Sequence, residues 1–158
     1  SLKYYNLGEK SMYDPCPAGW RVPPIMAFSK FTSTGAAVMG NYASTAVADR
    51  NGDGVVDTND YNYGYYFTLS GNTTSFFPAA TRWYGAYAAL YGSVAGHNGV
   101  YWSNSIYKST ISSQANSLMA TACLNFMSPQ AAGTCFVSAM GGGARSDGSS
   151  VRCVADKE

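Results

Sequence analysis

The chain is poor in charged residues, in histidine and in glutamate, and these shortages argue against several classes of function. Charged residues make up 12% of its 158 residues, the formal net charge is +1, and Lys and Arg form no run. Nucleic-acid binding therefore lacks the basic patch on which it depends. No apolar run approaches the ~20 residues that cross a bilayer, so we expect neither a nucleic-acid partner nor membrane insertion.

Residues suited to catalysis are equally scarce. His97 is the only histidine and lies in a Gly-His-Asn-Gly turn, so a Ser-His-Asp or Cys-His arrangement would depend on a turn residue. Glu9 and Glu158 are the only glutamates and lie near the two ends. Paired carboxylates for glycoside hydrolysis would have to come from Asp, most of which is concentrated in one loop. We therefore expect a binding protein and not an enzyme.

The residues that are plentiful favour strands and turns. The chain has 13 Tyr, 17 Gly and many Ser, Thr and Asn, and 46% of its residues are hydrophobic. This composition favours strands joined by turns over a helical bundle. Its length suits a single domain over residues 1–158 with a substantial core. The chain begins with Ser and not Met, so we expect it to be a segment of a larger protein with upstream domains.

The residue patterns predict one short helix and several strands. Pro23 and Pro24 open the helix and Gly35 ends it, and every third residue from Ile25 to Phe31 is apolar, which creates one buried face. Within residues 120–126 every second residue is apolar, which predicts a strand with one buried and one exposed face. Further strands are predicted at residues 2–7, 65–69, 75–77, 100–103, 135–140 and 150–154, ordered irregular structure at 81–99, and a turn or bulge at 141–143.

Four cysteines allow three disulfide pairings. Cys16 and Cys153 lie near the two ends, each beside a short apolar segment, which suggests that the ends meet and are joined. Cys123 and Cys135 either bridge adjacent strands or remain free as small buried residues, and their spacing leaves both alternatives open. A disulfide indicates an oxidising, extracellular compartment.

Residues 49–60 match the spacing of a twelve-residue calcium loop. Oxygen ligands fall at positions one, three, five, seven, nine and twelve, and Gly54 stands at position six, where the chain turns sharply. The predicted calcium ligands are Asp49, Asn51, Asp53, Val55 through its carbonyl, Asp57 and Asp60. Position twelve is Asp, as in dockerin-type loops, but no amphipathic helix flanks the loop. We expect an inserted, structural calcium site, and the alternative is an Asx-rich turn without metal.

Four motifs, in this order, resemble a known family. They are Cys-Pro-Ala-Gly-Trp-Arg-Val-Pro (16–23), Phe-Pro-Ala-Ala (77–80), Tyr-Trp-Ser-Asn-Ser (101–105) and Val-Arg-Cys-Val (151–154). Together they resemble the fibrobacter major paralogous domain, a C-type lectin-like module of Bacteroidetes surface and fimbrial-tip proteins. They are also similar to the variable proteins of diversity-generating retroelements. The resemblance implies an α+β, C-type lectin-like fold with small mixed sheets, one or two short helices and long ordered loops.

The resemblance also implies a function outside the cell. The expected protein is an adhesin, a fimbrial tip or a phage receptor-binding protein that binds a protein or glycan on a host or microbial surface. In the retroelement-diversified relatives the variable positions lie in the C-terminal third, which corresponds to residues 104–145 here. The ligand-binding candidates from that stretch and the aromatic segment before it are Tyr84, Tyr87, Asn104, Ile106, Tyr107, Lys108, Met119, Thr121, Cys123 and Asn125.

Two further expectations concern tryptophan and calcium. Trp20 and Trp102 belong to the family's motifs, and we expect both in the core. The Glu-Pro-Asn or Gln-Pro-Asp tripeptide of calcium-dependent sugar-binding lectins does not occur in this chain. Calcium is therefore expected to stabilise the fold and not to hold a sugar directly.

Two other functions compete with ligand binding. The first is a structural fimbrial tip subunit whose surface docks only onto a pilin. The second is an oxidative enzyme of the formylglycine-generating type, which shares the lectin-like fold and uses two cysteines, here Cys123 and Cys135. This second alternative depends on an analogy of fold alone.

Overall fold

The chain folds mostly into strands, with one short helix, in the residues that the structure describes. The structure is a computed structural model, and it describes residues 3–6, 10–31, 47–69, 73–84, 89–90, 96–108, 120–129, 136–143 and 147–156. The strands are β1 (Lys3–Asn6), β2 (Trp20–Arg21), β3 (Gly64–Thr68), β4 (Thr74–Pro78), β5 (Trp83–Tyr84), β6 (Ala89–Leu90), β7 (Asn98–Lys108), β8 (Ala120–Met127), β9 (Phe136–Gly143) and β10 (Val154–Ala155). The helix η1 is a 3-10 helix over Ile25–Phe31.

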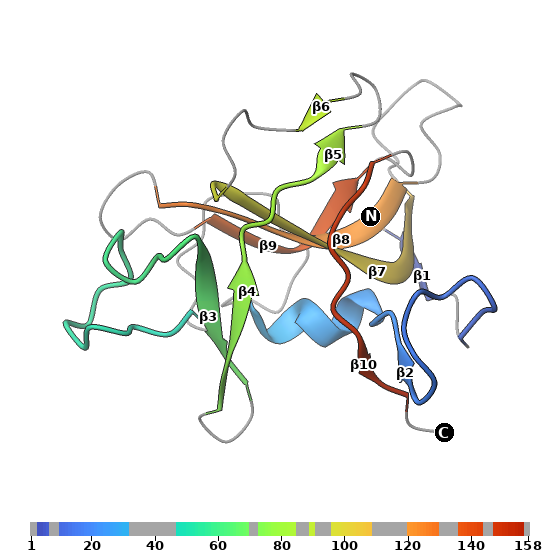
Figure 1. Ribbon diagram of the computed structural model, residues 1–158, viewed down its shortest axis with the longest axis horizontal. Helices are drawn as coiled ribbons and strands as arrows, with labels where there is room; N and C mark the ends of the chain where they lie inside the picture. Colours follow the sequence, from blue (N-terminus) through green and yellow to red (C-terminus); the bar gives the residue numbers. More distant parts are fainter. Residues whose placement is uncertain are drawn as a thin grey trace.

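These strands form small antiparallel sheets. The largest has four strands in the order β1-β7-β8-β9, and β2 with β10, β3 with β4 and β5 with β6 form two-stranded sheets. Helix η1 crosses one face of the four-stranded sheet, and the β3–β4 hairpin lies beside it (Figure 1). The α+β prediction thus agrees at the level of small sheets with a short helix. Within the described residues, no helix has the length and apolar character needed to cross a bilayer.

The helix follows directly from the spacing of its apolar residues. A 3-10 helix has three residues per turn, so a three-residue period places Ile25, Phe28 and Phe31 on one face. All three side chains are buried, and η1 contacts β7, β8 and β9. The predicted helix is confirmed in its position and its buried face. Its predicted end at Gly35 lies outside the described residues.

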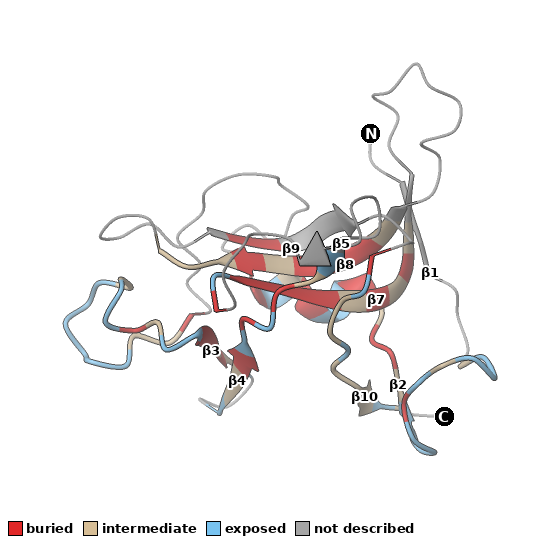
Figure 2. Cartoon of the chain, turned by 45° about the horizontal axis from the view of Figure 1, so that its top comes forward, coloured by how far each residue is buried: buried red, intermediate tan, exposed pale blue. Residues whose placement is uncertain are grey.

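The core lies between the four-stranded sheet, η1 and the β3–β4 hairpin. Ala122, Leu124 and Phe126 of β8 are fully buried there, which confirms the predicted alternation on that side of the strand. The Phe31 ring of η1 stacks on the Phe67 ring of the hairpin, with 4.5 Å between centroids. The central strands are accordingly coloured as buried in Figure 2, whereas the loops at both ends of the molecule are mostly exposed.

Some strands are longer than predicted because they pair with segments that are far away in the sequence. The hairpin of residues 65–69 and 75–77 is confirmed as β3 and β4, and the edge strand at residues 2–7 as β1. Residues 141–143 are not a turn, because they end β9 and pair with residues 121–123 of β8; the alternative of a bulge agrees with a register shift directly before Gly141. Conversely, only the end of the strand predicted at 150–154 belongs to β10. Three glycines give no local strand signal, so the partner strand decides their conformation.

The two ends of the chain meet as predicted. β2 pairs with β10, with Val154 opposite Arg21, and Cys16 is joined to Cys153 by a disulfide with 5.8 Å between the Cα atoms. The Arg21 guanidinium also lies 3.3 Å from the Asp156 carboxylate. The disulfide prediction is therefore confirmed, and it joins residues 137 positions apart.

Candidate functional site

The candidate site begins at an irregularity in β7. Trp102 lies opposite Cys123 of β8, whereas Ile106 lies opposite Thr121. Four positions along β7 thus correspond to two along β8, so β7 bulges between these pairs. A bulge re-aims the side chains that it contains and is common next to binding sites.

The bulged residues hold the start of η1. The Ser105 hydroxyl accepts a hydrogen bond of 3.0 Å from the backbone N–H of Ile25. The backbone N–H of Asn104 donates to the carbonyl of Pro23 at 2.9 Å. Ser103 and Ser105 are both buried, and Asn104 between them is only partly buried. The bulge therefore has a fixed backbone and presents the Asn104 side chain away from its two serine neighbours.

A cleft of about 360 Å³ lies where the bulge meets the disulfide-closed end of the molecule. Its lining comes from the loop before Cys16, from the segment after β2, from the β7 bulge and from the segment before Cys153. The lining residues are Ser11, Asp14, Pro15, Val22, Trp102, Ser103, Asn104 and Val151. Only the folded chain brings these segments together, and the disulfide keeps the first and the last in place.

Two charged side chains organise the loop that forms one wall of the cleft. The Asp14 carboxylate accepts hydrogen bonds from the backbone N–H of Cys16 at 2.8 Å and of Val22 at 2.9 Å. The Lys10 ammonium donates to three backbone carbonyls between Cys16 and Trp20 at 2.6–2.8 Å. This wall is thus held by a disulfide, an ammonium and a carboxylate, and its shape does not depend on a large core.

Asn104, which lines the cleft, carries an unused hydrogen-bond acceptor beside it. Its Oδ1 is buried and has no hydrogen-bond partner in the described part of the chain. A buried acceptor without a donor typically costs about 1–3 kcal/mol. A rotation of the Asn104 side chain that brings this oxygen into the cleft would let a ligand donor remove this cost, which makes Asn104 a candidate ligand contact.

The acidic loop of residues 49–60 lies at the opposite end of the molecule (Figure 1). Its backbone wraps around its own carboxylates: Asp49 accepts the N–H of Gly54 at 2.7 Å, and Asp60 accepts the N–H of Arg50 at 2.6 Å. Gly54 has a φ of +85°, which a residue with a side chain rarely adopts. The predicted sharp turn at this position is therefore confirmed.

Asp60 is the anchor of the acidic loop. Its side chain is 1% exposed, and it also accepts the backbone N–H of Asn51 at 3.4 Å and of Asp57 at 3.0 Å. Burial by itself would raise the pKa of Asp60, but the three N–H donors and the Arg50 charge outweigh it, so the pKa lies below its ordinary value. The last residue of the predicted calcium set is thus an ionised, structural carboxylate.

The acidic loop has the types of ligand that calcium prefers, but its side chains are not gathered around one point. Oxygen donors at the predicted positions and the turn at Gly54 suit a hard cation, and Val56 packs against the core at position eight. However, no three His, Cys, Asp or Glu side chains gather closely enough to hold a metal among the described residues. Asp53 and Asp57 instead accept backbone N–H groups of the loop. Calcium binding by this loop therefore stays a prediction.

The outward face of β8 is not the open surface that alternation predicted. Thr121 and Asn125 are partly exposed, but Cys123 between them is 2% exposed. Arg82 and Asp147, whose charged groups lie 3.3 Å apart, are close enough to act on its thiol, and burial raises the pKa of Cys123 to about 12. Cys123 is a free thiol, so the alternative of a bridge to Cys135 is wrong; Cys135 itself lies outside the described residues.

The remaining ligand-binding candidates do not gather at one place. Asn104 lines the cleft, and Ile106 pairs with Thr121 just beyond the bulge, whereas Asn125 lies opposite Val100, farther along the sheet. Tyr87 and Met119 lie outside the described residues. Tyr84, Tyr107 and Lys108 belong to β5 and β7, and their side chains lie outside the description.

The tryptophans differ from expectation, and His97 does not. Trp20 is 47% exposed and is not a core residue, because the β2–β10 pair to which it belongs has only two residues per strand. Trp102 is partly exposed and lines the cleft.

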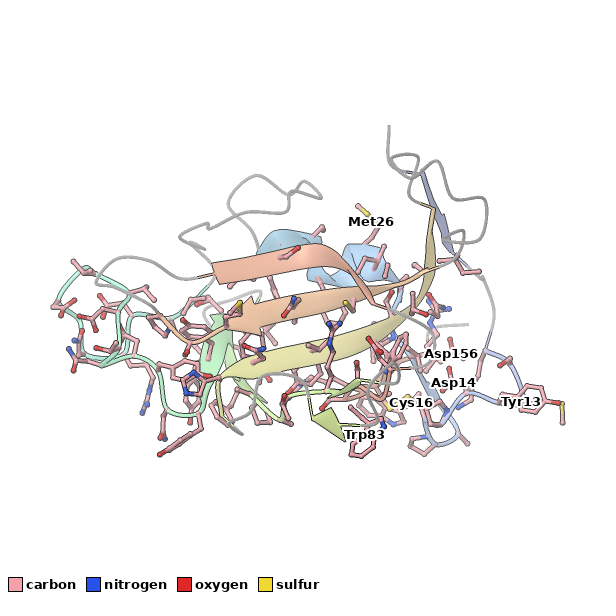
Figure 3. The ribbon with its side chains drawn as sticks, turned by 90° about the horizontal axis from the view of Figure 1, so that it is seen from above. Tyr13, Asp14, Cys16, Met26, Trp83 and Asp156 are labelled. Carbon is pink, nitrogen blue, oxygen red and sulfur yellow. A yellow bond between two sulfur atoms is a disulfide. The ribbon has the colours of Figure 1, made fainter. Side chains whose placement is uncertain are left out.

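His97 is exposed as predicted, and its Nδ1 lies 3.1 Å from the Ser128 hydroxyl. Trp83, 48% exposed, lies on the side of the molecule where Asp14 and Cys16 lie, opposite Met26 (Figure 3).

Sequence reasoning missed Asp14 and the cleft-lining role of Trp102. The one local signal was Asp14 two residues before Cys16, a spacing typical of an Asp side chain that bonds its own backbone. Nothing local connects either residue to Asn104. Compared with protein-family models, with curated proteins and with solved structures, this chain matches none of them.

Proposed function

We propose that this chain is a C-type lectin-like binding module that works outside the cell, on a bacterial surface, at a fimbrial tip or on a phage particle. The observation that carries the proposal is the junction of the two end motifs: β2 pairs with β10, Cys16 is bonded to Cys153, and a cleft opens beside them. The four motifs in order support the family, and a disulfide suits an oxidising compartment.

The proposed work is binding and not catalysis. A thiolate, and not a thiol, is the nucleophile in cysteine chemistry. Because burial raises the pKa of Cys123 to about 12, this thiol is almost entirely protonated near neutral pH. The ligand is a protein or a glycan on a host or microbial surface. In the sharper form of the proposal, residues 104–145 are diversified among relatives; no excess variation there would contradict that form.

A structural role for calcium completes the proposal. The predicted loop ligands lie at the opposite end of the molecule from β2 and β10 (Figure 1), and the cleft is lined by residues next to these strands. Calcium there would neutralise the Asp49, Asp53 and Asp57 carboxylates, which are partly or fully exposed, and add stability to the loop. It would not take part in holding the ligand.

The deciding experiment is a glycan array probed with the calcium-loaded protein and again in chelator. Binding to one class of glycan supports the proposal, as does a host or microbial surface protein captured by folded protein that ignores glycans. Binding to a pilin subunit alone would contradict it and favour a structural tip subunit. Thiol counting in the native state and in denaturant tests the enzyme alternative, which requires Cys123 to react without unfolding.

A further inference from the structure

We infer that the cleft beside the β7 bulge binds a neutral saccharide unit, with Trp102, Asn104 and Asp14 as the main contacts and without calcium. This inference rests on the proposed binding function and gives it a place and a ligand class. It differs from the variable-face hypothesis, because Asp14 and Trp102 lie outside residues 104–145.

The size and lining of the cleft suit a small ligand. Its volume of about 360 Å³ lies at the small end of the range for small-molecule sites, about 300–1,000 Å³. Pro15, Val22 and Val151 give it apolar walls. A few polar groups within mostly apolar walls are the usual composition of such sites. One or two sugar rings fit this description better than a protein surface, which needs a broad contact area.

The hydrogen-bonding groups of the cleft include donors, namely the Asn104 amide NH2, the Trp102 indole N–H and the Ser11 hydroxyl, and also acceptors. Asn104 Oδ1 has no partner. Each carboxylate oxygen of Asp14 accepts one backbone N–H, and an ionised carboxylate has about four acceptor positions in total. The Ser103 hydroxyl is already used, because it donates to the carbonyl of Ala122 at 2.6 Å. Sugar hydroxyl groups, which both donate and accept hydrogen bonds at close spacing, match this mixed set of groups.

Charge narrows the ligand class further. Among the described residues that line the cleft, Asp14 is the only charged one, and none is Lys or Arg. A sugar with a carboxylate, sulfate or phosphate would meet the Asp14 charge without a cation to offset it. A neutral sugar is therefore favoured, and its apolar ring face can contact the Trp102 indole while its hydroxyls donate to the acceptors.

The backbone that carries Trp102 and Asn104, and the carboxylate of Asp14, are held in place before a ligand arrives. The backbone N–H of Trp102 donates to the carbonyl of Ser150 at 2.9 Å, and that of Asn104 donates to Pro23. Asp14 is fixed by its two N–H donors within the disulfide-closed loop. A rigid site loses less conformational entropy on binding, which favours even a small ligand. None of these contacts involves the acidic loop.

The key variant is Asn104→Leu, which separates a binding role from a structural one. Leu has a similar shape, and the buried Oδ1 that it removes has no partner. We expect the melting temperature to stay level or to rise while saccharide binding falls at least tenfold. Ser138→Ala is the matched control, because Ser138 Oγ is also buried without a partner but does not line the cleft. It should leave binding within twofold of the unchanged chain.

Sugar binding to the full chain is measured by saturation-transfer NMR. The chain is titrated in turn with galactose, glucose, mannose, N-acetylglucosamine and N-acetylneuraminic acid. Binding of at least one of the four neutral sugars, and not of the acidic one, in calcium and in chelator, is the expected result. Val151→Phe, at a 39% exposed position of the wall, fills the cleft and should abolish binding even if Asn104→Leu fails to fold.

Three results would overturn the inference: no neutral sugar binds, Asn104→Leu and Val151→Phe both bind as the unchanged chain does, or folded protein loses binding in chelator. In the first case, capture of a surface protein would still support the proposed function. In the second, sugar binding elsewhere on the chain would support it. The saccharide site in the cleft and the proposed binding function can therefore be refuted independently.

Discussion

The acidic loop and the disulfide-closed end use the same local device but are stabilised differently. In each, an Asp carboxylate accepts backbone N–H groups: Asp60 accepts three and is buried, whereas Asp14 accepts two and is partly exposed. At the closed end a disulfide and the Lys10 ammonium complete the structure. In the acidic loop no covalent bond does so, and the Asp49, Asp53 and Asp57 carboxylates are partly or fully exposed.

The comparison shows that two ordered loops of one chain can depend on different conditions. The closed end depends on oxidation, whereas the acidic loop depends on ionised Asp60 and, as we predict, on calcium. Because the two lie at opposite ends of the molecule (Figure 1), changes in one should add to changes in the other with little coupling. Four measurements test whether the two regions are independent.

The largest effect is expected at the closed end. Replacing Cys16→Ser together with Cys153→Ser should lower the free energy of unfolding by about 2–5 kcal/mol, because the disulfide restricts the unfolded chain over a long loop. Urea unfolding at neutral pH measures this. The calcium response of the variant at low temperature is the control. Equal stability of the two proteins would show that the closed end is held by its noncovalent contacts alone.

The next effect is expected at the anchor of the acidic loop. Asp60→Ala leaves three backbone N–H groups without their acceptor and should cost about 3 kcal/mol in the same unfolding experiment. Asp53→Ala, at an exposed loop position, is the control and should cost less than about 1 kcal/mol. Similar losses for both variants would mean that burial of Asp60 is unimportant.

Calcium should stabilise the acidic loop and leave the closed end unchanged. At a concentration one hundred times its dissociation constant, a ligand of the folded state adds about 2.7 kcal/mol. Melting scans in calcium and in chelator should therefore differ, and Asp57→Asn should reduce the difference. Identical melting curves in the two conditions would refute a calcium site, and the Asx-rich turn without metal would remain.

The smallest expected effect is a pH dependence of folding stability, and it comes from Asp60 in the acidic loop. The pKa of Asp60 in the folded chain is lower than the ordinary 3.8, so ionised Asp60 stabilises the fold fully above about pH 4. This contribution disappears as the pH falls through the lowered value. The stability difference between the unchanged chain and Asp60→Asn, measured without calcium, should shrink below about pH 4. A constant difference would show that Asp60 does not titrate as described.

Local patterns were sufficient for elements whose environment repeats regularly. A three-residue period predicted the buried face of η1, and a two-residue period predicted that Ala122, Leu124 and Phe126 are buried. The calcium-loop spacing predicted the turn at Gly54. Each depends on residues close together in the chain, whose geometry a helix, a strand or a tight turn sets directly.

Local patterns failed where a distant segment covers a residue or leaves it open. Cys123 follows the outward period of β8, yet it is buried, and Arg82 and Asp147 lie close enough to act on it. Trp20 is apolar and adjoins the closed end, yet it is half exposed. The neighbours of both residues come from segments far away in sequence, and a periodic pattern carries no information about them.

By itself, the sequence determined the helix face, the alternation of β8, the acidic loop and the pairing of the end cysteines. Local geometry sets the first three, and the end motifs pointed to the fourth. Only the tertiary structure decided that Asp14, Trp102 and Asn104 share a cleft. Their meeting requires the β7 bulge, the β2–β10 pair and the disulfide together. It is a property of long-range pairing, which no single segment of the chain encodes.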